Sequence, residues 1–329
     1  MKQTTFNEFF SGKKILITGG LGMIGSNLAI ALVKLNGDVT LLNKSPGNLF
    51  NIQEIKNKIK LVIGDVTDKI TVARHVKGKD IIFHLAAKVS QFPLNFKDVI
   101  DDININRLSH LLMLESLRKY NDKAVIIFPG SRLEYGRPRK IPVNETAGLE
   151  PISFYGIDKV AAENYYSVYN KTYGIKTVCF RITNPYGPRG QMKSGSFNIV
   201  NWFIRKALNN EAITIYGNGE QLRDYIYIED LVDGLLIITS KKKAIGEIFN
   251  IGSGKAFKFK DMARLIVQIA GQGSIEYRDY PATYKILETG NFVADVRKIK
   301  KLGWNATTSR VDGIKRTIAY YKVYKQYYW

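Results

Sequence analysis

The sequence contains a single cysteine and no long hydrophobic run. Cys179 lies in the apolar stretch Thr177-Val178-Cys179-Phe180. It cannot form an internal disulfide, so we interpret it as a buried strand thiol in a protein of a reducing compartment. Apolar runs such as 14–18 are far too short to span a bilayer, and the first ten residues lack the apolar core of a secretory signal. We therefore expect a cytoplasmic protein with no membrane partner.

Acidic residues are also scarce, since 29 Asp and Glu stand against 49 Lys and Arg and give a formal net charge of +20. Such a charge attracts polyanions. The lysines are scattered, however, with only brief clusters at 241–243 and 298–301, and no basic stripe alternates with base-stacking aromatic residues. We interpret the charge as a solvated surface that also favours a phosphorylated small substrate. No nucleic-acid partner and no metal site are expected.

Up to about residue 180, short β-branched runs alternate with longer amphipathic segments. This pattern is typical of repeated βαβ units and predicts an α/β fold with a parallel sheet covered on both faces. Strands are expected at 14–18, 39–42, 59–63, 81–85, 125–128 and 177–182, and helices near 23–36, 68–77, 98–120 and 154–173.

The regular alternation stops beyond Asn184, where turn clusters at 185–190, 217–219 and 252–254 divide the chain. We predict a dinucleotide-binding domain over 1–182, with a return segment around 225–252, and a smaller lobe formed mainly by 183–329. No linker or internal repeat is visible. The two lobes are therefore expected to pack together, with the ligand in the cleft between them.

A glycine-rich turn, Thr18-Gly19-Gly20-Leu21-Gly22-Met23-Ile24-Gly25, joins the first predicted strand to an apolar-periodic helix. The free amides at the start of that helix would point at the turn, which is how a pyrophosphate is bound. The G-x-x-G-x-x-G spacing permits positive φ, close phosphate approach and tight contact between helix and strand. We prefer a dinucleotide site to an ordinary βα turn. The predicted cofactor contacts are Gly19, Gly22, Met23, Ile24 and Gly25.

The residues after the second and third predicted strands bear on the choice of cofactor. An acidic residue should end the second strand and hold the ribose hydroxyls, but Asn43 and Lys44 stand there. Asn43 can still bond a ribose hydroxyl, whereas Lys44 removes the usual repulsion of a 2′-phosphate. NAD is favoured, and NADP stays open. Asp65, followed by Val66, would contact the adenine or would simply cap a helix.

Tyr155 and Lys159 are four residues apart in a predicted helix and therefore project from one face. The ammonium of Lys159 would stabilise the phenolate and lower the pKa of Tyr155, which makes the tyrosine a usable base. Ser131 follows the strand predicted at 125–128, on the ligand-binding edge of such sheets, where its hydroxyl would hold the reacting oxygen. With a dinucleotide turn, these residues indicate redox chemistry on a hydroxyl or ketone.

Taken together, these residues resemble the extended short-chain dehydrogenase/reductase family, specifically its nucleotide-sugar epimerases and dehydratases. The resemblance covers nearly the whole chain. It rests on the ordered motifs at 18–25, Gly64-Asp65-Val66, His84-Leu85-Ala86-Ala87, Asn104-Ile105-Asn106, 131–136, 155–159, 181–188 and 221–226.

This resemblance implies a Rossmann-type doubly wound sheet with bound nicotinamide cofactor, and a smaller C-terminal α+β lobe that binds a nucleotide-diphosphate sugar. It implies that Tyr155 is the catalytic acid/base, that Lys159 holds the nicotinamide ribose and that Ser131 contacts the sugar oxygen. It also implies a homodimer formed through helices near 98–120 and 154–173. The further implied contacts are Leu85, Ala86, Ala87 and Asn106 for the cofactor, with Asn106 supporting Lys159, and Arg132, Asn184 and Arg223 for the substrate, with the last two on its diphosphate.

Several of these residues have a plainer alternative. His84 is interpreted as a satisfied structural histidine rather than a catalytic one, and Arg223 would otherwise pair with Asp224 or Asp230. Tyr155 would otherwise be an interface aromatic. The resemblance also implies an arginine late in the smaller lobe, and two residues are candidates for its position. These are Lys285 and Arg278. The aromatic C-terminus is interpreted as an amphipathic helix docked on the smaller lobe.

The residues after Ser131 bear on the reaction. Dehydratases of this family usually place an Asp-Glu pair there, but this chain has Arg132 and Leu133, and Glu134 stands one position late. We therefore favour epimerisation at C4 through a transient keto-sugar over atypical dehydration. A one-way 4-ketoreductase or dehydrogenase would use the same residues with an exchangeable cofactor. The non-enzymatic alternative is a nucleotide-sensing or RNA-binding relative.

Overall fold

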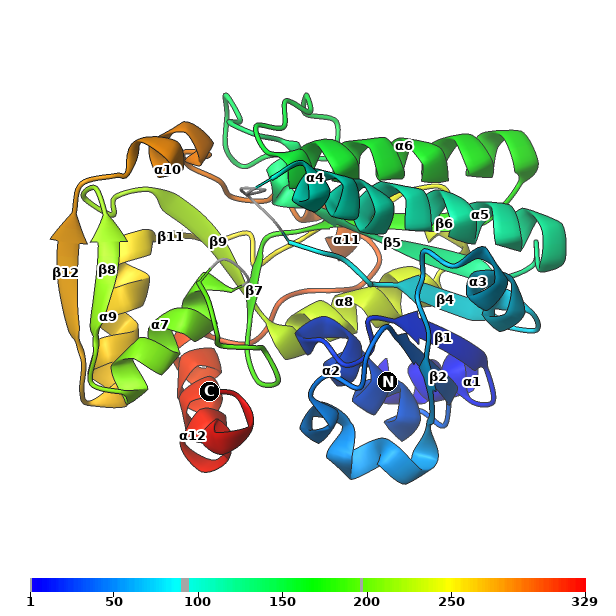
Figure 1. Ribbon diagram of the computed structural model, residues 1–329, viewed down its shortest axis with the longest axis horizontal. Coiled ribbons are helices and arrows are strands. Elements are labelled where there is room, and N and C mark those ends of the chain that lie inside the picture. Colours follow the sequence, from blue (N-terminus) through cyan, green and yellow to red (C-terminus); the bar gives the residue numbers. More distant parts are fainter. Residues whose placement is uncertain (1, 90–94, 196–197) are drawn as a thin grey trace.

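A parallel sheet of seven strands forms the centre of the computed structural model, which describes residues 2–89, 95–195 and 198–329 (Figure 1). Every pair of neighbouring strands in this sheet is parallel, in the order β10-β6-β5-β4-β1-β2-β3. The predicted α/β fold of the Rossmann type is thereby confirmed. The strands are β1 (Lys14–Thr18), β2 (Asp38–Asn43), β3 (Lys60–Ile63), β4 (Ile81–His84), β5 (Val125–Ser131), β6 (Lys176–Ile182) and β10 (Ile248–Ile251).

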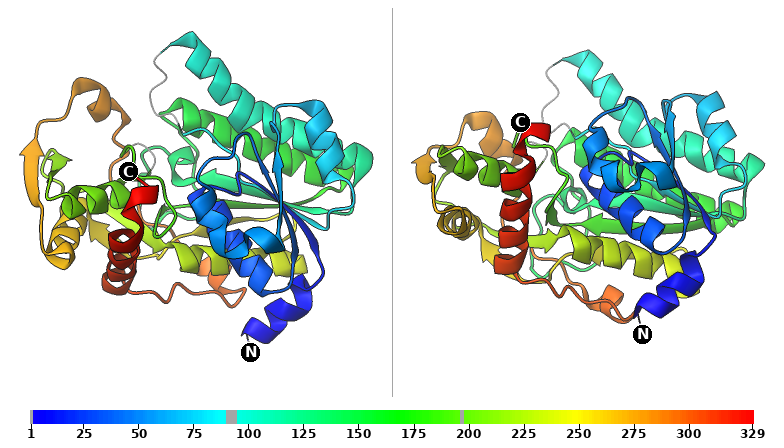
Figure 2. Two further views of the ribbon diagram at one scale, coloured as in Figure 1. Left: turned by 60° about the horizontal axis from the view of Figure 1, so that its bottom comes forward. Right: turned by 90° about the horizontal axis from the view of Figure 1, so that it is seen from below.

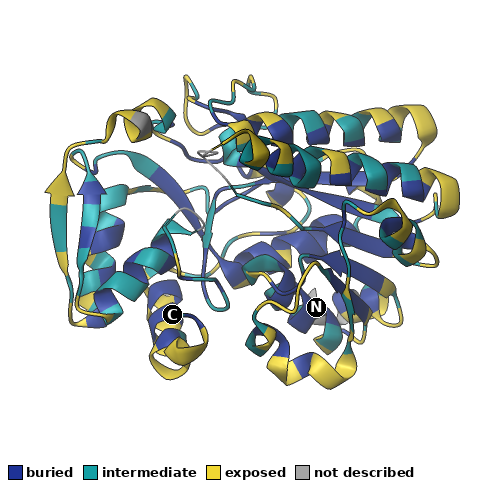
Figure 3. Cartoon of the chain, in the orientation of Figure 1, coloured by how far each residue is buried: buried dark blue, intermediate teal, exposed yellow. Residues whose placement is uncertain are grey.

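Helices cover both faces of the sheet because each strand sends alternate side chains into two separate cores. Leu16 of β1 packs in the core under one set of helices, whereas Ile15 and Ile17 pack in the core under the other. Figure 3 shows the strands buried and the outer helix surfaces exposed. One face carries α3 (Lys69–Val76), α5 (Ser109–Tyr120) and α6 (Phe154–Tyr173), and the other carries α1 (Lys2–Phe10), α2 (Met23–Lys34) and α8 (Ile228–Ser240).

The helix expected over 98–120 is interrupted. It consists of α4 (Phe96–Ile103), a π-helical turn η2 (Asn104–Leu108) and then α5. A π turn adds one residue to a helical turn, and such turns occur frequently at functional sites. The buried Asn106 lies in this turn. At the helix ends, the left-handed residues are Gly174 (φ +69) after α6 and Asn36 (φ 58) after α2.

A second group of elements lies beside the sheet, on the left of Figure 1. Its three-stranded sheet has the order β11-β9-β7, and β8 pairs with β12 in parallel. Its strands are β7 (Asn184–Tyr186), β8 (Ala212–Tyr216), β9 (Leu222–Tyr227), β11 (Ala256–Lys258) and β12 (Ser274–Arg278), and its helices are α7 (Ile199–Leu208), α9 (Phe259–Ala270), α10 (Ala282–Leu287) and α12 (Arg310–Tyr324). Between β9 and β11 the chain returns to the large sheet as α8 and β10. The short elements η4 (Lys242–Ala244) and α11 (Arg297–Lys300) lie near β10.

The C-terminus connects the two parts of the molecule. Helix α12 packs on α7, α9 and β9, as expected for an amphipathic helix docked on the smaller lobe (Figure 2). After α12 the chain forms the short element η5 (Lys325–Tyr327). Residues of this C-terminal end contact the 3-10 segment η1 (Leu49–Lys58), which follows β2. The Tyr327 ring stacks on Phe50 at 3.8 Å, and the Tyr328 hydroxyl donates to Asn51 Oδ1 at 2.6 Å. Asn51 Nδ2 in turn donates to the carbonyl of Leu21 in the glycine turn.

We predict that Tyr328→Phe destabilises the protein by about 1–3 kcal/mol, because it leaves the buried Asn51 Oδ1 and the Tyr320 hydroxyl without their partner. Urea unfolding followed by circular dichroism measures the effect. Tyr327→Phe is the control, since it keeps the stacked ring and should change stability by less than about 0.5 kcal/mol. Equal stability of both variants and the parent would contradict a role of this contact in joining the two lobes.

Candidate active site

The glycine turn after β1 has the geometry of an anion site. Gly19 adopts φ +67, and a Cβ on Gly25 would lie 2.5 Å from the carbonyl oxygen of Gly19, so a side chain there is sterically excluded. Helix α2 starts at Met23 with Gly22 as its N-cap, and it has neither a side-chain cap nor an acidic residue in its first turn. The amides and positive dipole end of α2 therefore suit a phosphate group.

The ends of β2 and β3 offer polar groups beside this turn. The side-chain oxygen of Asn43 is buried and has no hydrogen-bond partner among the described residues, which fits a ribose hydroxyl as donor. Lys44 forms an ion pair with Asp65 at 2.9 Å. Asp65 also accepts hydrogen bonds from the amide and hydroxyl of Thr67, so it closes its own turn, and Val66 is buried beside it.

The segment after β4 runs against the glycine turn. A Cβ on Gly19 would lie only 3.0 Å from the Cα of Ala86, in the predicted cofactor segment Leu85-Ala86-Ala87. The amide of Ala86 donates to Thr18 Oγ1 at 3.1 Å, and this hydroxyl lies 2.7 Å from His84 Nδ1. These hydrogen bonds hold the ends of β1 and β4 together, next to the glycine turn.

His84 is fully buried and both of its ring nitrogens have partners. Ser109 Oγ donates to the carbonyl of Ile105, so His84 Nε2 donates to Ser109 at 3.1 Å and His84 Nδ1 accepts from Thr18. Burial and the nearby Lys159 charge lower the pKa of His84 to about 3. The ring is neutral at physiological pH, and the geometry favours the structural interpretation.

Asn106 makes its side-chain hydrogen bonds to the segment after β4, and Lys159 Nζ hydrogen bonds to no described residue. The Asn106 amide bonds the backbone of Lys88, accepting from the nitrogen at 3.1 Å and donating to the oxygen at 2.7 Å. The π-helical turn at 104–108 carries this amide to the segment after β4. Asn106 therefore fixes the segment that follows Ala87.

Tyr155 and Lys159 lie in the first turns of α6, whose N-cap Ser153 accepts from the Gly156 amide at 3.2 Å. Lys159 is fully buried, and its Nζ has no hydrogen-bond partner among the described residues. The ammonium lies 5.1 Å from the Phe128 ring centroid and 5.5 Å from that of Tyr155. The expected shared face of the two side chains is therefore present.

The pKa values differ from the expectation that Lys159 lowers that of Tyr155. Burial, followed by the charge of Glu134, raises the pKa of the Tyr155 phenol. Burial also lowers the pKa of Lys159 to about 8, although Glu134 and Asp158 oppose this shift. Desolvation is the largest cause for both groups, since Lys159 is fully buried, Tyr155 is half-buried and neither has a direct partner of opposite charge.

Ser131 ends β5 and caps the short helix η3 (Arg132–Glu134), accepting from the Leu133 amide at 3.2 Å. The carboxylate of Glu134 turns back and accepts from the Ser131 amide at 2.6 Å. A Cβ on Gly156 would lie 2.7 Å from the Leu133 carbonyl oxygen, so the start of α6 is packed directly on this segment. Ser131 is thereby brought next to the turn that carries Tyr155.

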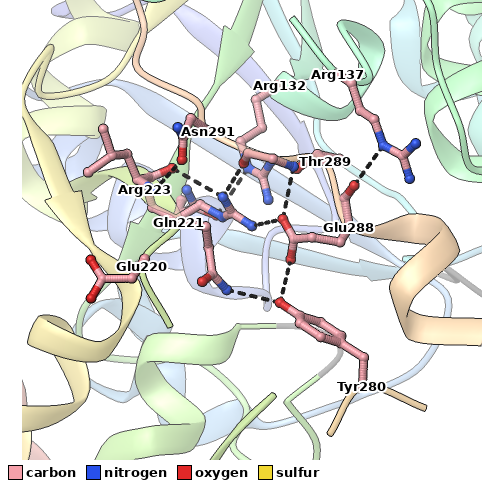
Figure 4. Close-up of polar contacts among 12 residues, drawn as sticks. Arg132, Arg137, Glu220, Gln221, Arg223, Tyr280, Glu288, Thr289 and Asn291 are labelled. Carbon is pink, nitrogen blue, oxygen red and sulfur yellow. Dashed lines mark hydrogen bonds and ion pairs between the residues drawn. The ribbon is translucent and has the colours of Figure 1, made fainter. Parts of the chain in front are cut away.

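Arg132, Asn184 and Arg223, the residues expected to contact the substrate, belong to one polar cluster, in which Figure 4 labels the two arginines. Arg132 donates to Asn184 Oδ1 at 3.2 Å and to Thr289 Oγ1 at 2.9 Å. Arg223 forms an ion pair with Glu288. Burial, followed by the charge of Arg223, lowers the pKa of Arg132 to about 9.

The alternative partners considered for Arg223 are engaged elsewhere. Asp224 accepts from the amides of Ser253, Gly254 and Ala294, and Asp230 accepts from the amides of Thr307 and Thr308. Lys285 is exposed, and Arg278 pairs with Glu276. Sequence reasoning missed Glu288, Thr289 and Tyr280, because nothing local marks a residue of the 280–290 segment as a partner of β9.

Comparison with known proteins identifies the family. Residues 15–252 match the model of the NAD dependent epimerase/dehydratase family. The chain belongs to this family. A putative UDP-glucose 4-epimerase of Methanocaldococcus jannaschii is 32% identical over 310 residues, which are 94% of this chain and 98% of the relative.

Solved structures of family members superpose closely. An epimerase from Methanothermobacter thermautotrophicus has a TM-score of 0.90 at 27% identity and covers 99% of this chain and 96% of its own. A UDP-glucose 4-epimerase from Thermotoga maritima, with UDP-glucose, has a TM-score of 0.86 at 29% identity, with 95% and 99% covered. This chain is thus an enzyme of the nucleotide-sugar epimerase and dehydratase type. In the described part of the chain, no helix combines the length and apolarity needed to cross a membrane.

Proposed function

We propose that this family member is a nucleotide-sugar 4-epimerase that works with bound NAD. The observation that carries the proposal is the convergence of Ser131, Tyr155 and Lys159 at the carboxyl edge of the sheet that also carries the glycine turn. The similarity to a putative UDP-glucose 4-epimerase and to a solved UDP-glucose 4-epimerase supports C4 as the reacting carbon.

The described residues fit a dinucleotide. The amides at the start of α2 would hold the pyrophosphate, Asn43 would accept from a ribose hydroxyl, and the buried Lys159 would donate to the nicotinamide ribose. When bound, the nicotinamide supplies a hydride acceptor that also returns the hydride. NAD is favoured over NADP because the Lys44 charge is already paired with Asp65.

The protein residues move the proton. Tyr155 would take the proton of the C4 hydroxyl and give it back to the keto oxygen, while the Ser131 hydroxyl holds this oxygen. Arg132, Asn184 and Arg223 would hold the diphosphate. The sugar ring then turns between oxidation and reduction, so the hydride returns to the opposite face and no cofactor is consumed.

The position of Glu134 argues against dehydration. Its carboxylate is fully buried and contacts the Ser131 amide and Arg181, so it faces the protein interior. Arg132 and Leu133 occupy the places of the usual acidic pair and offer no carboxylate. The alternative of a one-way 4-ketoreductase or dehydrogenase uses the same side chains and differs only in cofactor exchange.

A homodimer through α5 and α6 is also proposed. Leu108, the last residue of η2 before α5, is 40% exposed, and Ile157 and Val168 on α6 are 47% and 52% exposed. The neighbouring α4 adds the exposed Phe96. Exposed apolar side chains that gather on one surface are typical of protein interfaces.

We predict that the purified protein converts at least one nucleotide-diphosphate sugar of a panel into its C4 epimer, as followed by NMR, and that Tyr155→Phe lowers the rate at least about 100-fold. Tyr173→Phe, on the exposed end of the same helix, is the matched control and should retain activity. Continuous oxidation of added NADPH or reduction of added NAD would favour the one-way enzyme. Absence of turnover together with tight RNA binding would favour the non-enzymatic alternative.

For the cofactor, NAD should bind more tightly than NADP, and Asp65→Asn should improve NADP affinity roughly two- to fivefold by releasing the exposed Lys44 charge. Asparagine still accepts from Thr67, so the turn should stay intact. Calorimetric titration of both cofactors gives the ratio. Adding Lys44→Gln to Asp65→Asn should remove the gain, and an unchanged gain would show that Lys44 is not its source.

For the dimer, Val168→Asp places a charge in the proposed interface and should convert the protein to a monomer, measured by sedimentation velocity. Val323→Asp is the control. Val323 is 62% exposed on α12, away from the interface, and its change should leave the molecular mass unaltered. A monomeric parent protein would disprove the assembly.

A further inference from the structure

Glu134 is a fully buried carboxylate with a direct contact to the backbone of Ser131. Its Oε1 accepts from the Ser131 amide at 2.6 Å, and the Ser131 hydroxyl accepts from the Leu133 amide in return. The two side chains close a capping box around η3. The other carboxylate oxygen, Oε2, lies 3.4 Å from Arg181 Nε and has no hydrogen-bond partner among the described residues.

The guanidinium of Arg181 is mainly engaged by a different carboxylate. Arg181 Nε donates to Glu163 Oε2 at 2.9 Å and Nη2 donates to Glu163 Oε1 at 2.5 Å. Its Nη1 donates to the Tyr135 hydroxyl at 2.8 Å. Two buried carboxylates therefore share one guanidinium, and Glu134 has the poorer geometry. Burial and the charge of Glu163 raise the pKa of Glu134 well above its usual range.

Glu134 is also connected to the proposed base, Tyr155, by packing of its segment and by its charge. The Leu133 carbonyl packs on Gly156 with no room for a methyl group, so the segment 131–134 lies directly against the turn that carries Tyr155. The Glu134 charge raises the pKa values of both Tyr155 and Lys159. The titratable groups around Glu134 are Tyr155, Lys159 and Glu163 from α6, Cys179 and Arg181 from β6 and Tyr135 from its own turn.

We propose that Glu134 is a positioning residue for the sugar oxidation. It fixes the backbone of Ser131 through the capping box, and it places behind Tyr155 and Lys159 a buried carboxyl group that becomes negative as the pH rises. This inference rests on the proposed function. An apolar side chain at this position would fill the space but would leave the Ser131 amide without an acceptor and the buried ammonium without a nearby carboxylate.

The test is Glu134→Gln, which keeps an acceptor for the Ser131 amide and removes the negative charge that Glu134 acquires as the pH rises. Loss of a negative charge lowers the pKa of both Tyr155 and Lys159, so both limbs of the pH profile of kcat/KM should move to lower pH. The expected shift is at least about half a pH unit, or a roughly threefold change in rate on each limb. An unchanged profile would overturn the electrostatic part of the proposal.

Glu163→Gln is the matched control, because it removes a carboxylate from the same guanidinium but leaves Glu134 in place. It should not move the profile to lower pH, since loss of Glu163 leaves Glu134 more readily ionised. An equal downward shift in both variants would show a general effect of the buried charges. Glu134→Leu, which lacks the acceptor, should lower kcat about tenfold or more while KM changes less.

A second measurement does not depend on turnover. NMR titration of protein labelled with 13C at lysine Cε follows Lys159, whose signal is identified by its loss in Lys159→Met. Glu134→Gln should lower the Lys159 pKa from about 8, whereas Glu163→Gln should not. If the sugar panel gives no turnover but this shift is found, the proposed function fails and the electrostatic link stands. If turnover is found but Glu134→Gln shifts neither the pH profile nor the Lys159 pKa, the electrostatic link fails and the proposed function stands.

Discussion

Parallel hydrogen bonding between neighbouring strands is the constraint on which the site depends. Because all seven strands run the same way, the turn that follows each strand emerges at one edge of the sheet. The central pair β1 and β4 therefore brings Gly19 into contact with Ala86, and the neighbouring β5 delivers Ser131 to the same edge. Residues far apart in the sequence reach one edge of the sheet because the register between these strands is fixed.

The substrate side of the molecule is attached close to the cofactor turn. Asn27 of α2 donates to the carbonyl of Pro188, and Arg189 donates back to Asn27. Asn51 bonds Leu21 in the glycine turn, Arg189 and, through its oxygen, the C-terminal Tyr328. The segment after β7 is thus held against the start of α2 by polar contacts. Displacement of the smaller lobe would strain the cofactor turn, which couples the two binding regions.

Periodicity and glycine spacing were sufficient to predict the large sheet, the turn after β1 and the shared face of Tyr155 and Lys159. Features set by tertiary contacts were not predicted. The π turn at 104–108 has no local signal, and the ion pair between Arg223 and Glu288 joins segments 65 positions apart. Glu134 is different, because Ser131-x-x-Glu134 is a capping-box pattern that gives the direction of its carboxylate from sequence alone. The sequence prediction compared Glu134 only with the dehydratase carboxylates and did not use the capping-box pattern.

The buried Lys159 explains why desolvation outweighs the attraction expected within the catalytic pair. An ammonium that hydrogen bonds to no described residue is costly to bury, and the rings of Phe128 and Tyr155 offset only part of that cost. Glu134 and Asp158 keep its pKa from falling further, yet Glu134 also opposes ionisation of the Tyr155 phenol. One carboxylate therefore raises the pKa of both the ammonium and the phenol, and it favours the protonated form of each. Such a site resists premature proton loss and requires a further positive charge or hydroxyl donor next to Tyr155 before its phenolate becomes accessible.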